Sequence, residues 1–219
     1  FHNSGGVSYF KIESSDIEQR PFERFQTFTV SLIGIYCVLV LACTLCYVAA
    51  GMEPFHAVNH AMSTVATGGF STHDTSFLRY ADNPGVLWTG IVFMFIGALP
   101  FSIMILFAVR GRFDALRDPQ IRVFAGYCIV LVVAMAIYLR VGLGRPFDDA
   151  VTHSAFNIVS IITTAGFASD DYTLWGPFAL GLFFLATFLG GCSGSTTGGI
   201  KAYRFLILFE ILANGLQRL

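Results

Sequence analysis

Two short glycine-containing segments are the residues best suited to bind an ion. They are Thr67-Gly68-Gly69-Phe70 and Thr164-Ala165-Gly166-Phe167. Glycine permits the unusual backbone dihedrals that turn successive carbonyl groups toward one axis. A ring of such carbonyls, with threonine hydroxyls beside them, can replace the hydration shell of an alkali cation. The alternative is that both segments are tight turns in an unrelated helix bundle.

The two segments belong to an internal repeat. The matched positions are Ser63 with Ser160, Thr67 with Thr164, Gly69 with Gly166, Phe70 with Phe167, Thr72 with Ser169, and Asp74 with Asp171. Each segment follows a Pro-Phe pair and a helix-compatible stretch of about 13 to 18 residues, a length typical of re-entrant helices. Further upstream, residues 57–60 match residues 150–153 only if the second copy gains four residues, which is close to one helical turn.

The composition indicates an all-α membrane protein. Apolar residues make up 55% of the chain and charged residues 12%, against about 25% charged residues in soluble domains. Apolar runs cover about residues 25–50, 84–109, 121–139 and 174–189, and a fifth run at 202–213 is too short to span alone. A net charge of −1 gives no reason to expect a nucleic-acid partner, and we predict none.

Basic residues between the runs set the expected topology. Arg20 and Arg24 precede the first run, and Arg110, Arg112 and Arg117 follow the second. The positive-inside rule places both clusters in the cytoplasm, so both Thr-x-Gly-Phe segments face outward. We therefore predict a cytoplasmic linker at 1–24, a pore repeat at 25–109, a cytoplasmic basic loop at 110–120 and a second pore repeat at 121–219. Each repeat consists of a span, a re-entrant pore helix, a filter loop and a span.

Other polar residues near the filters have less specific roles. Asp74, Asp170 and Asp171 follow the filters and would raise the local cation concentration at an outer mouth, unless they are ordinary solvated loop acids. His56, His60 and His153 lie on the pore helices and are expected to pack or hydrogen-bond behind the filters rather than bind metal. Potassium at the filters is the only metal that we predict. No catalytic triad, paired acids or zinc-spaced set is apparent, so we predict neither an enzyme nor an organic cofactor.

A glycine-rich stretch interrupts the last apolar region. Its lysine is preceded by isoleucine and followed by alanine, so the phosphate-loop pattern G-x-x-x-x-G-K-[ST] is not met. Irregular backbone inside a membrane is tolerated where it lines a cavity or is buried in protein. We therefore predict that the last inner helix is broken by an intramembrane loop that serves as a gate or as a structural break. Its residues are Gly190, Gly191, Cys192, Ser193, Gly194, Ser195, Thr196, Thr197, Gly198 and Gly199, with Lys201 at its edge.

These segments together resemble motifs of the Trk/Ktr/HKT potassium-transporter superfamily, in its bacterial Trk form. The motifs are STVATGGFSTHD, SIITTAGFASDDY and GGCSGSTTGGIK. The resemblance covers the chain from about residue 25 and implies the second and third of four potassium-channel-like repeats around one pore. It also implies that the loop beneath the filter is a gate and that a cytoplasmic nucleotide-binding ring regulates the protein. The expected location is the bacterial inner membrane.

Two filters cannot close a fourfold pore. We therefore expect either that the chain is part of a longer protein, which we favour, or that two copies associate as a homodimer. The predicted function is potassium uptake. The alternatives are a sodium-permeable or sodium/potassium-cotransporting relative, in which serine tends to replace a filter glycine, and a membrane scaffold that conducts no ion.

Overall fold

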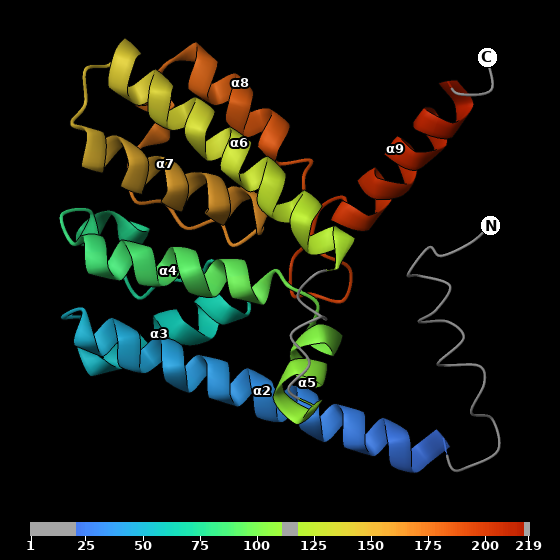
Figure 1. Cartoon of the computed structure of the whole chain (residues 1–219). Coiled ribbons are helices and arrows are strands. Elements are labelled where there is room, and N and C mark those ends of the chain that lie inside the picture. Colours follow the sequence, from blue (N-terminus) through green and yellow to red (C-terminus); the bar gives the residue numbers. More distant parts are fainter. Residues whose placement is uncertain (1–20, 111–117, 217–219) are drawn as a thin grey trace.

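The computed structural model describes residues 21–110 and 118–216, and within these ranges the chain is built from helices. The first group of elements is α2 (Pro21–Ala49), α3 (Pro54–Val65), η1 (Ser76–Tyr80), α4 (Pro84–Gly97) and α5 (Phe101–Arg110). The second group is α6 (Pro119–Gly142), α7 (Phe147–Ile162), η3 (Tyr172–Trp175), α8 (Pro177–Ala186) and α9 (Ala202–Leu216). In Figure 1 the two groups lie side by side, with α4 next to α7. Most of the expected linker and basic loop, including Arg20, Arg112 and Arg117, lies outside the described residues.

Two described helices are long and apolar enough to cross a membrane. They cover Gln26–Ala49 and Pro119–Gly142, 24 residues each, or about 36 Å at 1.5 Å per residue. A hydrocarbon core is about 30 Å thick. Large apolar side chains such as Val38, Leu41 and Leu45 are exposed along α2, as a lipid-facing surface requires. The chain is therefore a helical membrane protein.

The second apolar run is not one continuous helix. Residues 84–109 form α4 and α5, which meet at an angle of 95°. Pro100 lies at the break and has no N–H to continue the helix. The break also frees the carbonyls of Gly97 and Ala98, which accept hydrogen bonds from the glycine-rich loop. The run is therefore a bent pair of helices, and the apolar composition does not predict the bend.

The two groups of helices share a tightly packed centre. Phe77 of η1 is fully buried and lies 5.0 Å from Phe156 of α7, measured between ring centroids. Gly90 of α4 faces the same side chain, and a Cβ at this glycine would lie 2.9 Å from Phe156 Cε2 and 3.2 Å from Tyr47 Oη. Glycine thus allows α4 to approach α7 closely. This contact sets the distance between the two Thr-x-Gly-Phe segments.

We expect Gly90→Ala to destabilise the protein by about 1–3 kcal/mol, because the added methyl group overpacks a buried contact. Gly126→Ala on α6 is the matched control, since no atom lies within 4 Å of a Cβ there. The measurement is the temperature at which the detergent-solubilised full-length protein loses its monodisperse peak. Equal temperatures for both variants would contradict the close α4–α7 contact.

Candidate functional site

The two Thr-x-Gly-Phe segments have the same unusual backbone conformation. Thr67 and Gly69 have φ values of 50° and 72°, and Thr164 and Gly166 have values of 58° and 80°. A positive φ is a genuine outlier for a β-branched residue, yet it recurs at both threonines. The intervening Gly68 and Ala165 do not share it. Alternation between positive and negative φ can turn consecutive carbonyl groups toward one side of a chain, which is the arrangement that ion coordination needs.

Each segment starts where a short helix ends. α3 stops at Val65 and α7 at Ile162, two residues before Thr67 and Thr164 respectively. The C-terminal ends of both helices therefore point at the segments, and the partial negative charge there favours a cation. Among the described residues, no group of three or more His, Cys, Asp or Glu side chains is placed to hold a metal. Backbone carbonyls and threonine hydroxyls are thus the oxygen donors that the site offers.

Serine anchors distinguish the two loops. The Ser160 hydroxyl donates to the Phe167 carbonyl at 2.7 Å, while its own carbonyl accepts from Ala165 N at 2.9 Å. At the matched position the Ser63 carbonyl accepts from Gly68 N at 2.8 Å, but the buried Ser63 hydroxyl has no partner. The matched serine therefore holds the loop after α7 through its hydroxyl and its carbonyl, and the loop after α3 through its carbonyl alone.

The two phenylalanines differ more strongly. Phe167 is 2% exposed and packs against Phe77 with ring centroids 4.7 Å apart, so it lies among side chains of the first group of helices. Phe70 is 82% exposed. The equivalent side chain of one repeat is thus inserted into its neighbour, while that of the other repeat contacts little within the described residues.

The histidines correct the alignment of the repeats. His56 Nδ1 lies 2.7 Å from Thr72 Oγ1, and His153 Nδ1 lies 2.9 Å from Ser169 Oγ. Both pairs are 16 residues apart, so His56 is the counterpart of His153 without any gap. The predicted match of residues 57–60 with 150–153 is therefore wrong. The four extra residues instead lengthen α7 at its start, since α7 has 16 residues and α3 has 12.

The acidic residues that follow the two Thr-x-Gly-Phe segments differ in their hydrogen bonds and ion pairs. Asp74 is exposed, whereas Asp171 caps η3 by accepting from Thr173 N at 3.1 Å. Asp170 pairs with Arg145 at 2.6 Å and accepts from Trp175 Nε1 at 3.0 Å. Partial burial alone would raise the pKa of Asp170, but these hydrogen bonds outweigh it and lower the pKa. Asp170 thus serves as a structural anion more than as a free charge at the mouth.

The two ends of the glycine-rich loop are hydrogen-bonded to each other, and its middle residues contact other parts of the protein. Gly190 N donates to Ile200 O at 3.0 Å and Ile200 N to Phe188 O at 3.1 Å, which brings the ends of α8 and α9 together. Lys201 folds back over the loop and donates to the Thr197 carbonyl. The interior backbone turns at Gly194, whose φ is 76°.

The loop tip contacts both Thr-x-Gly-Phe segments and the α4–α5 break. Thr196 Oγ1 lies 3.1 Å from Gly97 O and 3.2 Å from Thr67 Oγ1. Gly198 N donates to Thr164 Oγ1 at 2.7 Å. Cys192 N donates to Ala98 O, and Phe101 N to Gly194 O, both at 3.0 Å. Because Thr67 and Thr164 are the first residues of the segments, the loop lies at the end where the chain leaves the short helices.

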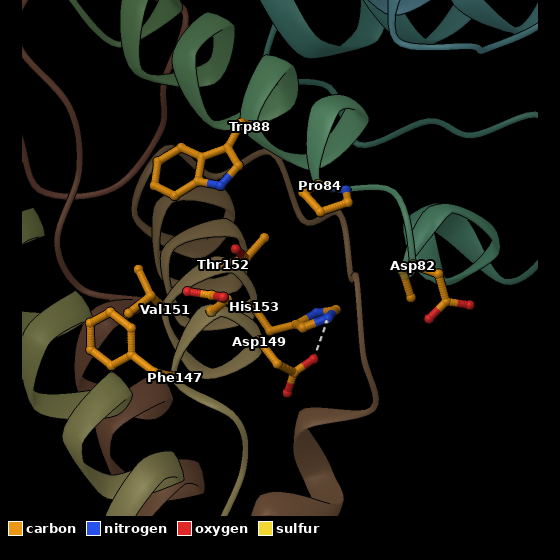
Figure 2. Close-up of a pocket in the computed structure, with 10 residues that line it drawn as sticks. Asp82, Pro84, Trp88, Phe147, Asp149, Val151, Thr152 and His153 are labelled. Atoms are coloured by element: carbon orange, nitrogen blue, oxygen red, sulfur yellow. Dashed lines mark ion pairs between the residues drawn. The ribbon is translucent and has the colours of Figure 1, made fainter.

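A separate cavity of about 530 Å³ lies between the start of α4 and the start of α7 (Figure 2). Its wall includes Asp82, Trp88 and Asp148, and it reaches the ion pair between Asp149 Oδ1 and His153 Nε2, which are 3.3 Å apart. This polar connection and the Arg145 pair were not predicted from the sequence. In the sequence, an acidic residue lies about one helical turn before two of the histidines, Glu53 before His56 and Asp149 before His153. This spacing could have indicated the acid–histidine pairs.

The chain matches known proteins over nearly all of its length. The family described as "TrkH: Cation transport protein" matches residues 22–218. The chain is 42% identical over its whole length to the Trk system potassium uptake protein TrkI of Halomonas elongata, of which it covers 44%. It is 36% identical to the Trk system potassium uptake protein TrkH of Salmonella typhimurium, with 98% of the chain and 45% of that protein covered.

A solved structure agrees with these matches. The crystal structure of the potassium transporter TrkH from Vibrio parahaemolyticus superposes with a TM-score of 0.84 at 35% identity, and covers 93% of this chain and 44% of that one. The chain thus spans less than half the length of these relatives. They are transporters, in agreement with the prediction that the chain is not an enzyme. This chain belongs to the TrkH family of cation transport proteins.

Proposed function

We propose that the protein takes up potassium across the bacterial inner membrane through a pore whose filter includes Thr67–Phe70 and Thr164–Phe167. The observation that carries this proposal is the shared alternation of φ in the two segments, each at the C-terminal end of a short helix. The relatives named above are potassium uptake proteins, which supports potassium as the ion. In this arrangement both filters face outward.

The glycine-rich loop is the proposed gate of this pore. It lies against the innermost residues of both filter segments, since Thr196 contacts Thr67 and Gly198 contacts Thr164. An ion leaving the filter toward the cytoplasm would meet the loop at this point. The contacts of the loop with the two filter segments are the hydrogen bonds of Thr196 with Thr67 and of Gly198 with Thr164, each with a net value of about 1 kcal/mol. These contacts can open while the backbone bonds between the loop and the α4–α5 break remain.

Two protein partners are part of this proposal. A cytoplasmic nucleotide-binding ring that regulates the gate rests on the family resemblance, and a second copy of the protein in a homodimer rests on the argument that two filters cannot close a fourfold pore. The lipid bilayer is the surroundings that the apolar helices require. Nothing in the described residues favours the sodium-permeable alternative, because Gly69 and Gly166 are both present.

We expect Gly166→Ser in the full-length protein to lower the preference for potassium over sodium. A Cβ at Gly166 meets no atom within 4 Å, although its φ is 80°, so the variant changes the filter conformation without a steric clash. At Gly69 a Cβ would lie 1.9 Å from the Ala165 carbonyl oxygen, so Gly69→Ser should mainly reduce the amount of folded protein. The measurement is potassium and sodium uptake in a potassium-uptake-deficient host.

Equal selectivity of the Gly166→Ser variant and the parent would remove the filter assignment. A scaffold that conducts no ion would show no uptake by the parent. It would also show no rise in melting temperature with potassium beyond that with sodium, because only a bound ligand shifts the unfolding equilibrium.

We expect Thr196→Val to raise potassium uptake. Valine keeps the shape but loses the hydrogen bonds to Gly97 O and Thr67. A loss of about 1 kcal/mol corresponds to about a fivefold change in the ratio of undocked to docked loop. Thr89→Val is the matched control, because the Thr89 hydroxyl bonds only within α4, to Gly85 O at 2.8 Å. Unchanged or lower uptake at parental membrane abundance would show that the loop is structural.

A further inference from the structure

In both repeats a histidine ties the start of the pore helix to the chain that leaves the filter. His56 reaches Thr72, and His153 reaches Ser169, through Nδ1. Thr72 and Ser169 each lie two residues after the filter phenylalanine. The tie therefore closes a loop that contains the whole filter segment, and it fixes the direction in which that segment leaves the site.

The other ring nitrogen of each histidine faces a carboxylate. His153 Nε2 lies 3.3 Å from Asp149 Oδ1, and His56 Nε2 lies 3.6 Å from Glu53 Oε2. The result in each repeat is a line of carboxylate, imidazole and hydroxyl. The side chain of His153 is 8% exposed and that of His56 is 23% exposed. The second repeat thus has the more buried and shorter version of the same arrangement.

The hydrogen-bond directions in the second repeat follow from Asn157. Its Nδ2 donates to Ser169 Oγ at 2.9 Å, and its Oδ1 accepts from Ser169 N at 3.2 Å. Ser169 is fully buried, so its hydroxyl hydrogen needs an acceptor. His153 Nδ1 is the atom in place to accept it. The proton of the neutral ring is then on Nε2, where it points at Asp149.

We propose that His153, oriented by Asp149, is a positioning residue that sets ion selectivity by holding the exit of the second filter segment through Ser169. His56 with Glu53 performs the same task more weakly. This inference rests on the proposed function of the site. Without an acceptor at Nδ1, the buried Ser169 hydroxyl would lose its hydrogen-bond partner.

The charged groups around His153 fix the position of Asp149. Asp149 faces His153 on α7, and Asp148 and Asp82 line the cavity of Figure 2. Arg145 Nη1 lies 3.4 Å from Asp149 Oδ2 and 2.6 Å from Asp170 Oδ2. The carboxylate that orients His153 is therefore held by the same arginine that holds Asp170.

The test compares full-length variants in the same potassium-deficient host, with membrane abundance measured for each. His153→Leu and Ser169→Ala should each lower the ratio of potassium to sodium uptake about fivefold, the value of one hydrogen bond. The double variant should be no worse than either single variant, because both remove one shared interaction. Asp148→Asn is the control in the same cavity and should keep the parental ratio.

His153→Asn separates positioning from simple packing. An asparagine Oδ1 can take the place of Nδ1 as the acceptor. We expect this variant to keep the parental ratio of potassium to sodium uptake. If the leucine and alanine variants fail to reach the membrane, this comparison still decides the question.

Two results would overturn the inference. One is a parental ratio in His153→Leu at normal abundance, and the other is a ratio lowered about fivefold in His153→Asn at normal abundance. A parent that takes up no potassium would instead contradict the proposed function. The two failures are therefore distinguishable.

Discussion

Peptide groups inside a membrane must find their hydrogen-bond partners within the protein, and this requirement shapes the centre of the molecule. Two helical regions are interrupted there, one between α4 and α5 and one between α8 and α9. Each interruption supplies what the other lacks, because the carbonyls of Gly97 and Ala98 accept from the glycine-rich loop and the Phe101 amide donates to it. The loop and the bend therefore satisfy each other's backbone hydrogen-bonding groups, and each depends on the other for these partners.

The repeated architecture is read most clearly from hydrogen bonds. The two Thr-x-Gly-Phe segments share their φ pattern, their bonds to the preceding helix and their histidine ties. They differ in one serine, since the Ser160 hydroxyl has a partner and the Ser63 hydroxyl has none. Where the second repeat has Asn157 bonded to Ser169, the first has His60, whose Nε2 lies 3.0 Å from Ser71 Oγ. The Arg145–Asp170–Trp175 contacts add further support to the second repeat.

The sequence predicts the helical membrane class, the repeated Thr-x-Gly-Phe segments after two short helices and the interruption after α8, because glycine, threonine and apolar run length carry direct local signals. The bend at Pro100 was missed, since apolar composition alone cannot show that the freed carbonyls meet a loop about 95 residues later along the chain. The alignment of residues 57–60 with 150–153 was wrong because it matched similar residue types and not their distance from the Thr-x-Gly-Phe segments. The pairing of Asp170 with Arg145 depends on how α7 packs, which no short pattern records. Ion binding at the filter and loop stays a prediction.

The different surroundings of Phe70 and Phe167 give the arrangement a direction. Phe167 packs against Phe77 in the other repeat, whereas Phe70 is 82% exposed. A contact in which one unit inserts and the next receives is heterologous, and such contacts join units head to tail. The two repeats therefore do not exchange identical contacts: the second inserts its aromatic side chain into the first, and the first leaves the corresponding side chain exposed.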